Sequence, residues 1–540
     1  MIKKNISILA LFTLISRIFG LIRSILLASF LGTTFVADAF TIAFKIPNLL
    51  RRLVAEGSMT AAFLPVFSDV QKETENNKKK ESIFLSKFYS LSFIILFSIC
   101  CLGMYFTPLL INLLYSLGNQ QTELTIFLTR YMFAYLGFIS LASITQSVLN
   151  ANFKFAIPAI SPIILNITII SSAILLKNMI STELLFKILP QTKPYLINSD
   201  ILLQATKASV AFATGVLIGG ALQLIIQLPL FFKLGYSIVF TTSFKDKHIP
   251  MIGKLMLPGI FGMGIYQINA LIADPFVLAY LEKGCIAALN YSNRLVEFTL
   301  GIFVISLSTV ILPSLSKSVS NKNMEEYANL IINSIKLVIF ISIPATFGLI
   351  ALREDLITLL FKTGLFDDKS TYLVSQAVLY HASGLVFIAI YRIYSPAFFA
   401  LKDTKTPVKG AFISLIVNII LCAILPKYMK IGGIALASSI SALFNGGYLM
   451  FKLEAKVKEI RPSKFIETFG KSLISSLIMF AAIIWLKDMG ESIMTSRFYT
   501  LLKILSLTIM GAMLYFITAY LFSMKEVITI TSKIKSKLQD

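Results

Sequence analysis

The chain has 540 residues, of which 56% are apolar and only 14% are charged. Soluble domains carry fewer long apolar runs, so this composition excludes a soluble globular protein. Lysine and arginine outnumber aspartate and glutamate by 49 to 27, which gives a net charge of +22. Because membrane proteins concentrate basic residues in their cytoplasmic loops, we attribute this excess to topology and not to nucleic-acid binding.

A helix needs about 20 apolar residues to cross a bilayer. The sequence contains fourteen segments of this kind, at residues 6–31, 34–67, 86–112, 124–150, 155–177, 206–232, 252–281, 285–316, 330–351, 372–400, 408–426, 432–451, 469–486 and 500–523. We therefore predict an all-α polytopic membrane protein with about fourteen transmembrane helices. Arginines interrupt the first segment, and no small-residue cleavage site follows it, so we expect a retained helix and not a signal peptide.

The loops between these segments alternate in charge. Basic residues gather in the stretches at 71–82, 245–254, 401–409, 452–464 and 532–540. The stretch SLGNQQTE at 116–123 has no lysine or arginine. Since cytoplasmic loops are enriched in both residues, this pattern predicts that the two termini lie in the cytoplasm.

Short motifs recur about 250 residues apart, which indicates an internal repeat. LINLLYSLG at 110–118 returns as LITLLFKTG at 356–364, and LPVFS at 64–68 returns as LPSLS at 312–316. One repeat contains six predicted helices. An even number gives both copies the same orientation and relates them by a pseudo-twofold axis along the membrane normal.

The repeat predicts the domain organisation. We expect two pseudo-symmetric six-helix lobes at 1–232 and 251–456, a cytoplasmic linker at 233–250, and two further helices with a basic tail at 457–540. A longer outer loop is expected at 178–205. The stretch at 353–370 is expected to form a short amphipathic helix at the outer interface.

Five arginines stand inside or between apolar segments: Arg17, Arg23, Arg51, Arg52 and Arg294. A charge at the centre of a spanning helix costs roughly 2.5–3.5 kcal/mol even on a lenient insertion scale. A guanidinium group presents a planar fork of donors that binds phosphate through two hydrogen bonds. The arginines therefore predict a polar cavity that holds an anion. The alternative is that each pairs with a local acid or extends to the membrane surface.

Acidic and amide residues accompany these arginines at Asp38, Asn48, Glu56 and Glu297. Polar groups are expensive inside a bilayer and mark functional networks there. We interpret this set as a gate or a network with the arginines, with a local hydrogen-bonded pair as the alternative.

A separate carboxylate, Asp274, lies in a predicted helix, and Ser414 and Asn418 lie one turn apart in another. A carboxylate with facing oxygen donors predicts a site for a coupling Na⁺ or proton. The alternative is a hydrated carboxylate near the outer interface.

The sequence lacks the motifs of several enzyme classes. It contains no GxxxxGK[ST], HExxH or GxSxG motif, and its four cysteines have no CxxC spacing. We therefore expect a transporter without a bound cofactor. Its energy source would be an ion gradient, the membrane potential or mass action.

Five motifs closely resemble the MurJ (MviN) family of lipid II flippases, within the MATE-like exporter superfamily: SRIFGLIR at 16–23, KIPNLLRRLVAEGS at 45–58, NANFKFAIPAISP at 150–162, YSNRLVEF at 291–298 and LKDTKTPVK at 401–409. The resemblance runs from residue 6 to the end of the chain. It implies alternating-access transfer of lipid II, a polyprenyl-pyrophosphate-linked disaccharide-peptide, across the bacterial inner membrane for peptidoglycan synthesis.

The resemblance also implies roles for individual residues. Arg17, Arg23, Arg51 and Arg294 match family arginines that engage the pyrophosphate. Asp38, Asn48, Glu56 and Glu297 match family residues that are important for activity. The chain departs from the family pattern at two positions, because Ser24 and Asn293 stand where an acid is usual.

Other functions stay open at this point. A flippase for another polyprenyl-pyrophosphate-linked glycan shares the phosphate handle, and a MATE-like cation-coupled exporter shares the superfamily. A membrane-embedded enzyme would need a catalytic acid near an outer loop, for which the dense candidates are Glu354 with Asp355 and Asp367 with Asp368. The expected partners are lipid II, membrane lipids and cell-wall synthesis proteins, with a monomeric protein and no nucleic acid.

Overall fold

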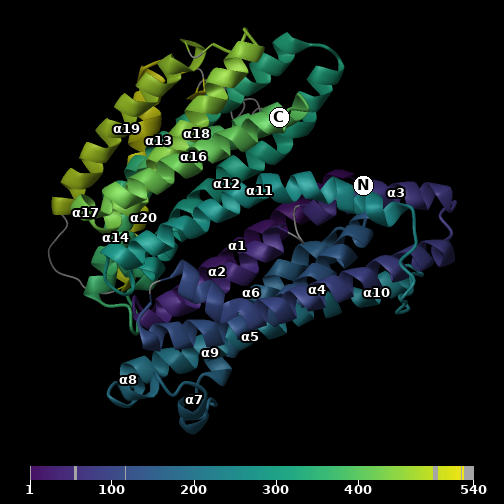
Figure 1. The fold of residues 1–540 in the computed structure, drawn as a ribbon. Helices are drawn as coiled ribbons and strands as arrows, with labels where there is room; N and C mark the ends of the chain where they lie inside the picture. The colour runs from purple at the N-terminus through teal and green to yellow at the C-terminus, as the bar shows by residue number, and fades with distance from the viewer. Residues whose placement is uncertain are drawn as a thin grey trace. The chain divides into compact units, whose positions relative to one another are not determined.

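The computed structural model describes residues 2–53, 58–115, 117–461, 463–489, 497–524 and 526–527 (Figure 1). Twenty helices account for the regular structure of these residues, and no strand occurs among them. The predicted all-α fold is confirmed. Helices satisfy their own backbone hydrogen bonds, which is what a chain in hydrocarbon requires.

The chain packs as two units, which are described separately. The first contains Met1–Ala287 and the short segment Thr363–Phe366. Its helices are α1 Ile2–Leu31, α2 Phe35–Arg51, α3 Ser58–Glu73, α4 Lys78–Leu114, α5 Asn119–Ala151, α6 Ala156–Leu176, α7 Thr182–Ile188, α8 Lys193–Ile197, α9 Asp200–Ile225, α10 Leu228–Lys233 and α11 His248–Tyr280, with the first residues of α12 Cys285–Ser320.

The second unit contains Ala288–Lys362 and Asp367–Asp540. It holds most of α12 and the helices α13 Met324–Phe361, α14 Asp368–Ser383, α15 Leu385–Ala400, α16 Lys405–Ile424, α17 Pro426–Met429, α18 Ile431–Lys456, α19 Ser463–Met489 and α20 Arg497–Leu521. Packing thus groups α11 with α3 in the first unit. The predicted lobes follow the sequence repeat instead and stay a prediction.

All fourteen predicted segments overlap helices. Ten helices in the described part of the chain are long and apolar enough to cross a membrane, and α14 with α15 forms a further span bent by 46°. The multi-span class is therefore confirmed, while the count of fourteen stays a prediction. The segment at 34–67 is divided into α2 and α3, and α2 ends in a wider π-helical turn at Arg52 and Leu53.

Two loop predictions need correction. The stretch at 353–370 is not a separate interfacial helix, because α13 continues to Phe361 and α14 begins at Asp368. Asp355 forms ion pairs with Lys487 at 3.1 Å and Lys503 at 3.8 Å, which hold this polar end of α13 against α19 and α20. The loop at 178–205 contains the short helices α7 and α8.

The linker after α10 runs in an extended conformation along α4. Its backbone N–H groups at Ser237, Val239 and Thr241 donate to the hydroxyls of three serines, each at 3.0 Å: Ser82, Ser86 and Ser90. Two residues of extended chain span about 6.6 Å, and four residues of helix rise about 6 Å. Every second N–H group of the linker therefore meets every fourth side chain of α4, and the match holds over three contacts.

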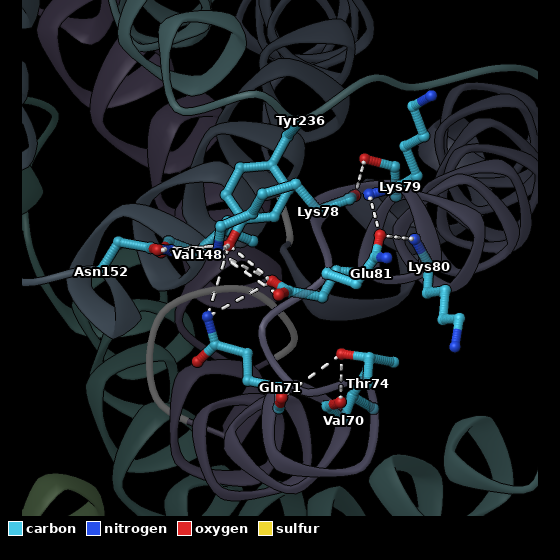
Figure 2. A network of polar contacts seen from close by, with 12 residues as sticks. Val70, Gln71, Thr74, Lys78, Lys79, Lys80, Glu81, Val148, Asn152 and Tyr236 are labelled. Atoms are coloured by element: carbon cyan, nitrogen blue, oxygen red, sulfur yellow. Dashed lines mark hydrogen bonds and ion pairs between the residues drawn. The ribbon is translucent and has the colours of Figure 1, made fainter.

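A buried polar cluster fixes the start of this linker (Figure 2). The Tyr236 hydroxyl donates to Glu81 at 2.8 Å and accepts from Lys78 at 2.8 Å and Asn152 at 2.9 Å. The Glu81 side chain is fully buried and forms an ion pair with Lys78 at 3.1 Å. Burial raises the pKa of the Tyr236 phenol, so the phenol stays protonated and donates to the carboxylate. The cluster joins α4 and α5 to the linker.

We expect the variant Ser82→Ala/Ser86→Ala/Ser90→Ala to release the linker. Each lost hydrogen bond contributes about 1 kcal/mol, so the open population should rise at least on the order of tenfold. Trypsin should then cleave faster at Lys245 and Lys247. The exposed Ser98, on the same helix, provides the control Ser98→Ala. Equal cleavage of both variants would show that other contacts hold the linker.

Candidate functional site

The predicted arginines fall on three helices. Arg17 and Arg23 lie partly buried on α1, and Arg17 lines a cavity of about 530 Å³. Arg51 is the last residue of α2, and Arg52 caps that helix. Arg294 lies in α12, within the second unit.

Two of the predicted companions contact their arginines. The Arg51 Nε group donates to Asn48 Oδ1 at 2.9 Å, one turn back on α2. Arg294 lies 3.7 Å from Glu297, and both side chains are about 40% exposed, at 38% and 44%. An exposed pair of this kind contributes little because solvent screens it. The guanidinium of Arg294 is therefore not locked by its acid. Glu56 lies outside the described residues.

The residues at the two departures from the family pattern make no replacement ion pair. Ser24 is buried, and its hydroxyl donates to the carbonyl of Gly20 at 3.0 Å within α1. Asn293 is exposed on α12. Neither side chain carries charge, so the positive charge of Arg23 and Arg294 is not reduced at these positions.

Asp38 has a different setting from the arginine network that the sequence predicted. Its carboxylate is fully buried and accepts from the backbone N–H groups of Gly284 at 2.6 Å and Ala287 at 2.8 Å. These amides belong to the start of α12, where a helix leaves N–H groups without intrahelical partners and carries partial positive charge. Asp38 therefore caps α12 from α2.

The turn that Asp38 binds has little free space. Gly284 has φ +95°, and a Cβ atom there would lie 1.9 Å from the carbonyl oxygen of Thr33. The segment Thr363–Phe366 packs similarly, since the Leu365 N–H donates to the carbonyl of Ser29 at 2.8 Å. A Cβ atom at Gly364 would lie 2.3 Å from the same oxygen. The turns at Gly284 and Gly364 therefore pack closely against the end of α1 and the residues that follow it.

Asp274 pairs with a lysine that the sequence reading did not select. Both carboxylate oxygens accept from Lys45 Nζ, at 2.6 and 2.8 Å, and Asp274 is 4% exposed. The contact joins α2 to α11. Lys45 stands within the apolar stretch AFKIPN, and a lysine in such a stretch requires a nearby carboxylate. That requirement was the signal that could have identified it.

Ser414 and Asn418 bond within the second unit. The Ser414 hydroxyl donates to the carbonyl of Ser441 at 3.0 Å, and Asn418 Oδ1 accepts from Cys422 at 3.5 Å. These contacts join α16 to α18 and stabilise α16 itself. The coupling site formed by both residues with Asp274 stays a prediction.

Comparison with known proteins identifies the family. A family model described as "Lipid II flippase MurJ" matches residues 27–524. The chain belongs to the MurJ lipid II flippase family. Two proteins named "Probable lipid II flippase MurJ" are similar to it. The protein from Vibrio cholerae is 31% identical, and the alignment covers 90% of this chain and 89% of the relative. The protein from Treponema pallidum is 34% identical, and the alignment covers 81% of this chain and 78% of the relative.

Solved structures give the same family and a wider fold class. The structure titled "Lipid II flippase MurJ, inward closed conformation" aligns with a TM-score of 0.75 and 29% identity, over 95% of this chain and 98% of that one. An inward-facing MATE family transporter aligns with a TM-score of 0.63, over 82% of this chain and 96% of that one. Its identity is 12%, so this second likeness concerns the fold alone. The predicted MurJ resemblance is confirmed, and the second alignment shows that the fold is shared with a MATE family transporter.

The pair formed by Lys45 and Asp274 gives a direct test of buried charge. We expect Lys45→Met to lower stability by about 3–5 kcal/mol, because it leaves a buried carboxylate without its partner. The double variant Lys45→Met/Asp274→Leu should recover most of that loss. Thermal unfolding of the purified protein in detergent measures both. Lys79→Met at an exposed lysine is the control, and additive losses in the double variant would contradict the pairing.

Proposed function

We propose that this protein transfers lipid II from the cytoplasmic to the periplasmic leaflet of the bacterial inner membrane by alternating access. The observation that carries the proposal is family membership over residues 27–524, with relatives named as lipid II flippases. The multi-span all-α fold suits a transporter, and the family and its relatives are named as flippases and not as enzymes. Cytoplasmic termini, a monomeric state and contacts with cell-wall synthesis proteins belong to the same proposal.

The arginines supply the chemistry for the pyrophosphate. Arg17 and Arg23 are six residues apart on one helix, which separates them by about 9 Å along its axis. That spacing suits contacts with different groups of one large head. Arg51, Arg52 and Arg294 add three further guanidinium groups, and charge-assisted hydrogen bonds from arginine to phosphate are strong and directional.

An apolar cavity suits the polyprenyl tail. It has a volume of about 680 Å³ in the second unit, between α13, α19 and α20. Apolar side chains such as Phe340, Leu349, Met479 and Phe516 line it. Burying hydrocarbon against such a surface is favourable in proportion to the area removed from water. This assigns a role to the two helices that lie beyond the sequence repeat.

The coupling ion is a further part of the proposal. Asp274 already binds an internal cation, the Lys45 ammonium group, so Na⁺ or a proton would have to compete with it. Coupling would then link ion binding to the contact between α2 and α11. The membrane potential and mass action are the alternatives that need no such competition.

Arginine variants test the phosphate contacts. We expect Arg17→Ala, Arg23→Ala and Arg294→Ala each to lower the rate of lipid II exposure about 10- to 100-fold, because a hydrogen bond to a charged group contributes about 1.5–3 kcal/mol. Lysine replacements should recover part of the rate, since they keep the charge but lose the planar fork. Complementation in cells depleted of their own flippase, with lipid II exposure assayed in the outer leaflet, measures the effect.

The exposed Arg130, which donates to the carbonyl of Met104, provides the control Arg130→Ala. If all three alanine variants support growth at normal expression, the arginines do not bind the pyrophosphate.

Collapse of the Na⁺ gradient or of the membrane potential tests ion coupling independently of the phosphate contacts. We expect loss of the Na⁺ gradient or of the membrane potential to stop lipid II exposure in cells that retain the wild-type protein. If coupling acts through Asp274, Asp274→Asn should remove the response to the ion while some exposure continues by mass action. Exposure that depends on neither gradient would exclude Asp274 as a coupling site and leave the flippase proposal intact.

A further inference from the structure

The cavity beside Arg17 has polar chemistry that the phosphate contact does not explain. It lies between α1, α5 and α6 in the first unit and measures about 530 Å³. Thr13, Ser16 and Arg17 line one side, and Gln146, Asn150 and Phe155 line the other. Two sequence motifs supply residues to this cavity, SRIFGLIR and NANFKFAIPAISP, and only the two arginines of the first have been given a role.

Gln146 and Asn150 are four residues apart on α5, so their side chains lie on one face of the helix. Both are partly buried at the cavity wall, and neither side chain hydrogen-bonds to another residue in the described part of the chain. Each amide offers two donors and one acceptor oxygen. A half-buried amide without a partner is most favourable when a ligand supplies one.

The cavity carries no acidic residue, and Arg17 is the only charged residue that lines it among those described. One guanidinium group beside two amides and two hydroxyls fits an anion joined to a neutral group rich in hydroxyl and amide functions. Phe155 adds an aromatic surface, and such a ring packs against the C–H face of a sugar. The composition matches a phosphorylated amino sugar better than a bare phosphate or a lipid tail.

We propose that this cavity is a sugar-recognition subsite, in which Gln146 and Asn150 hydrogen-bond to hydroxyl or acetamido groups of the sugar next to the phosphate that Arg17 holds. This inference rests on the proposed flippase function and adds the residues that select the head group. Asn150 lies at the end of α5, next to the exposed Lys154. In the predicted topology this end faces the cytoplasm, where the cargo is loaded.

Two lipid probes separate sugar recognition from phosphate binding. One is a polyprenyl pyrophosphate, and the other is the same lipid carrying the disaccharide-peptide. Binding to the purified full-length protein in nanodiscs would be measured for Gln146→Met and Asn150→Leu, which keep side-chain size but remove hydrogen bonding. We expect each variant to weaken binding of the glycosylated lipid about tenfold and to leave binding of polyprenyl pyrophosphate unchanged.

Arg17→Ala is expected to weaken binding of both lipids, and Asn112→Leu, at an exposed amide on α4, is expected to weaken neither. If the amide variants affect both lipids equally, or neither lipid, the subsite assignment is wrong. If the wild-type protein binds neither lipid, the proposed function itself fails. Sugar-independent binding by the wild-type protein would overturn only the subsite.

Discussion

The contact on which the first unit depends is the buried carboxylate of Asp38 at the start of α12. A carboxylate taken out of water is expensive unless hydrogen bonds satisfy it. Here two backbone N–H groups do so, and they lie where the helix dipole is positive. Those N–H groups have no partner within α12. The carboxylate therefore supplies the acceptor that they lack, and they supply the donors that it requires. The turn at Gly284 can approach closely enough only because it has no side chain.

Helix α2 carries this contact and a second one within the first unit. The helix carries Asp38 in its first turn, Lys45 in its middle and Asn48 with Arg51 at its end. Lys45 binds α11 through Asp274, and Asp38 binds the start of α12. Both of these contacts lie before Pro47, and the last turn of the helix follows it. The π-helical turn at Arg52 widens the backbone there, and such turns often occur at functional sites.

The sequence predicted the fold class well because spanning helices obey a strong rule. Long apolar runs must be helical in a bilayer, so their number and extent can be read from composition. Boundaries were harder to predict. Helix α13 continues to Phe361, and in its last turns Asp355 pairs with lysines that lie more than 100 residues later in the chain. The energetic cost of buried charge singled out the candidate arginines in the sequence, but their partners could not be predicted, since a hydropathy pattern carries no information on which helices touch.

Asp38 and Asp274 illustrate the limit most clearly. Both were selected as polar residues in apolar segments, and both are buried as such a selection implies. Their partners differ in kind: Asp38 accepts from backbone N–H groups at the start of α12, and Asp274 accepts from the Lys45 ammonium group. The hydropathy pattern does not distinguish these two kinds of partner. The arginines differ from both, because Arg294 keeps an exposed and weak pair and Arg17 faces a cavity. The buried carboxylates of Asp38 and Asp274 therefore hold elements of the first unit together, whereas Arg17 borders a cavity of about 530 Å³.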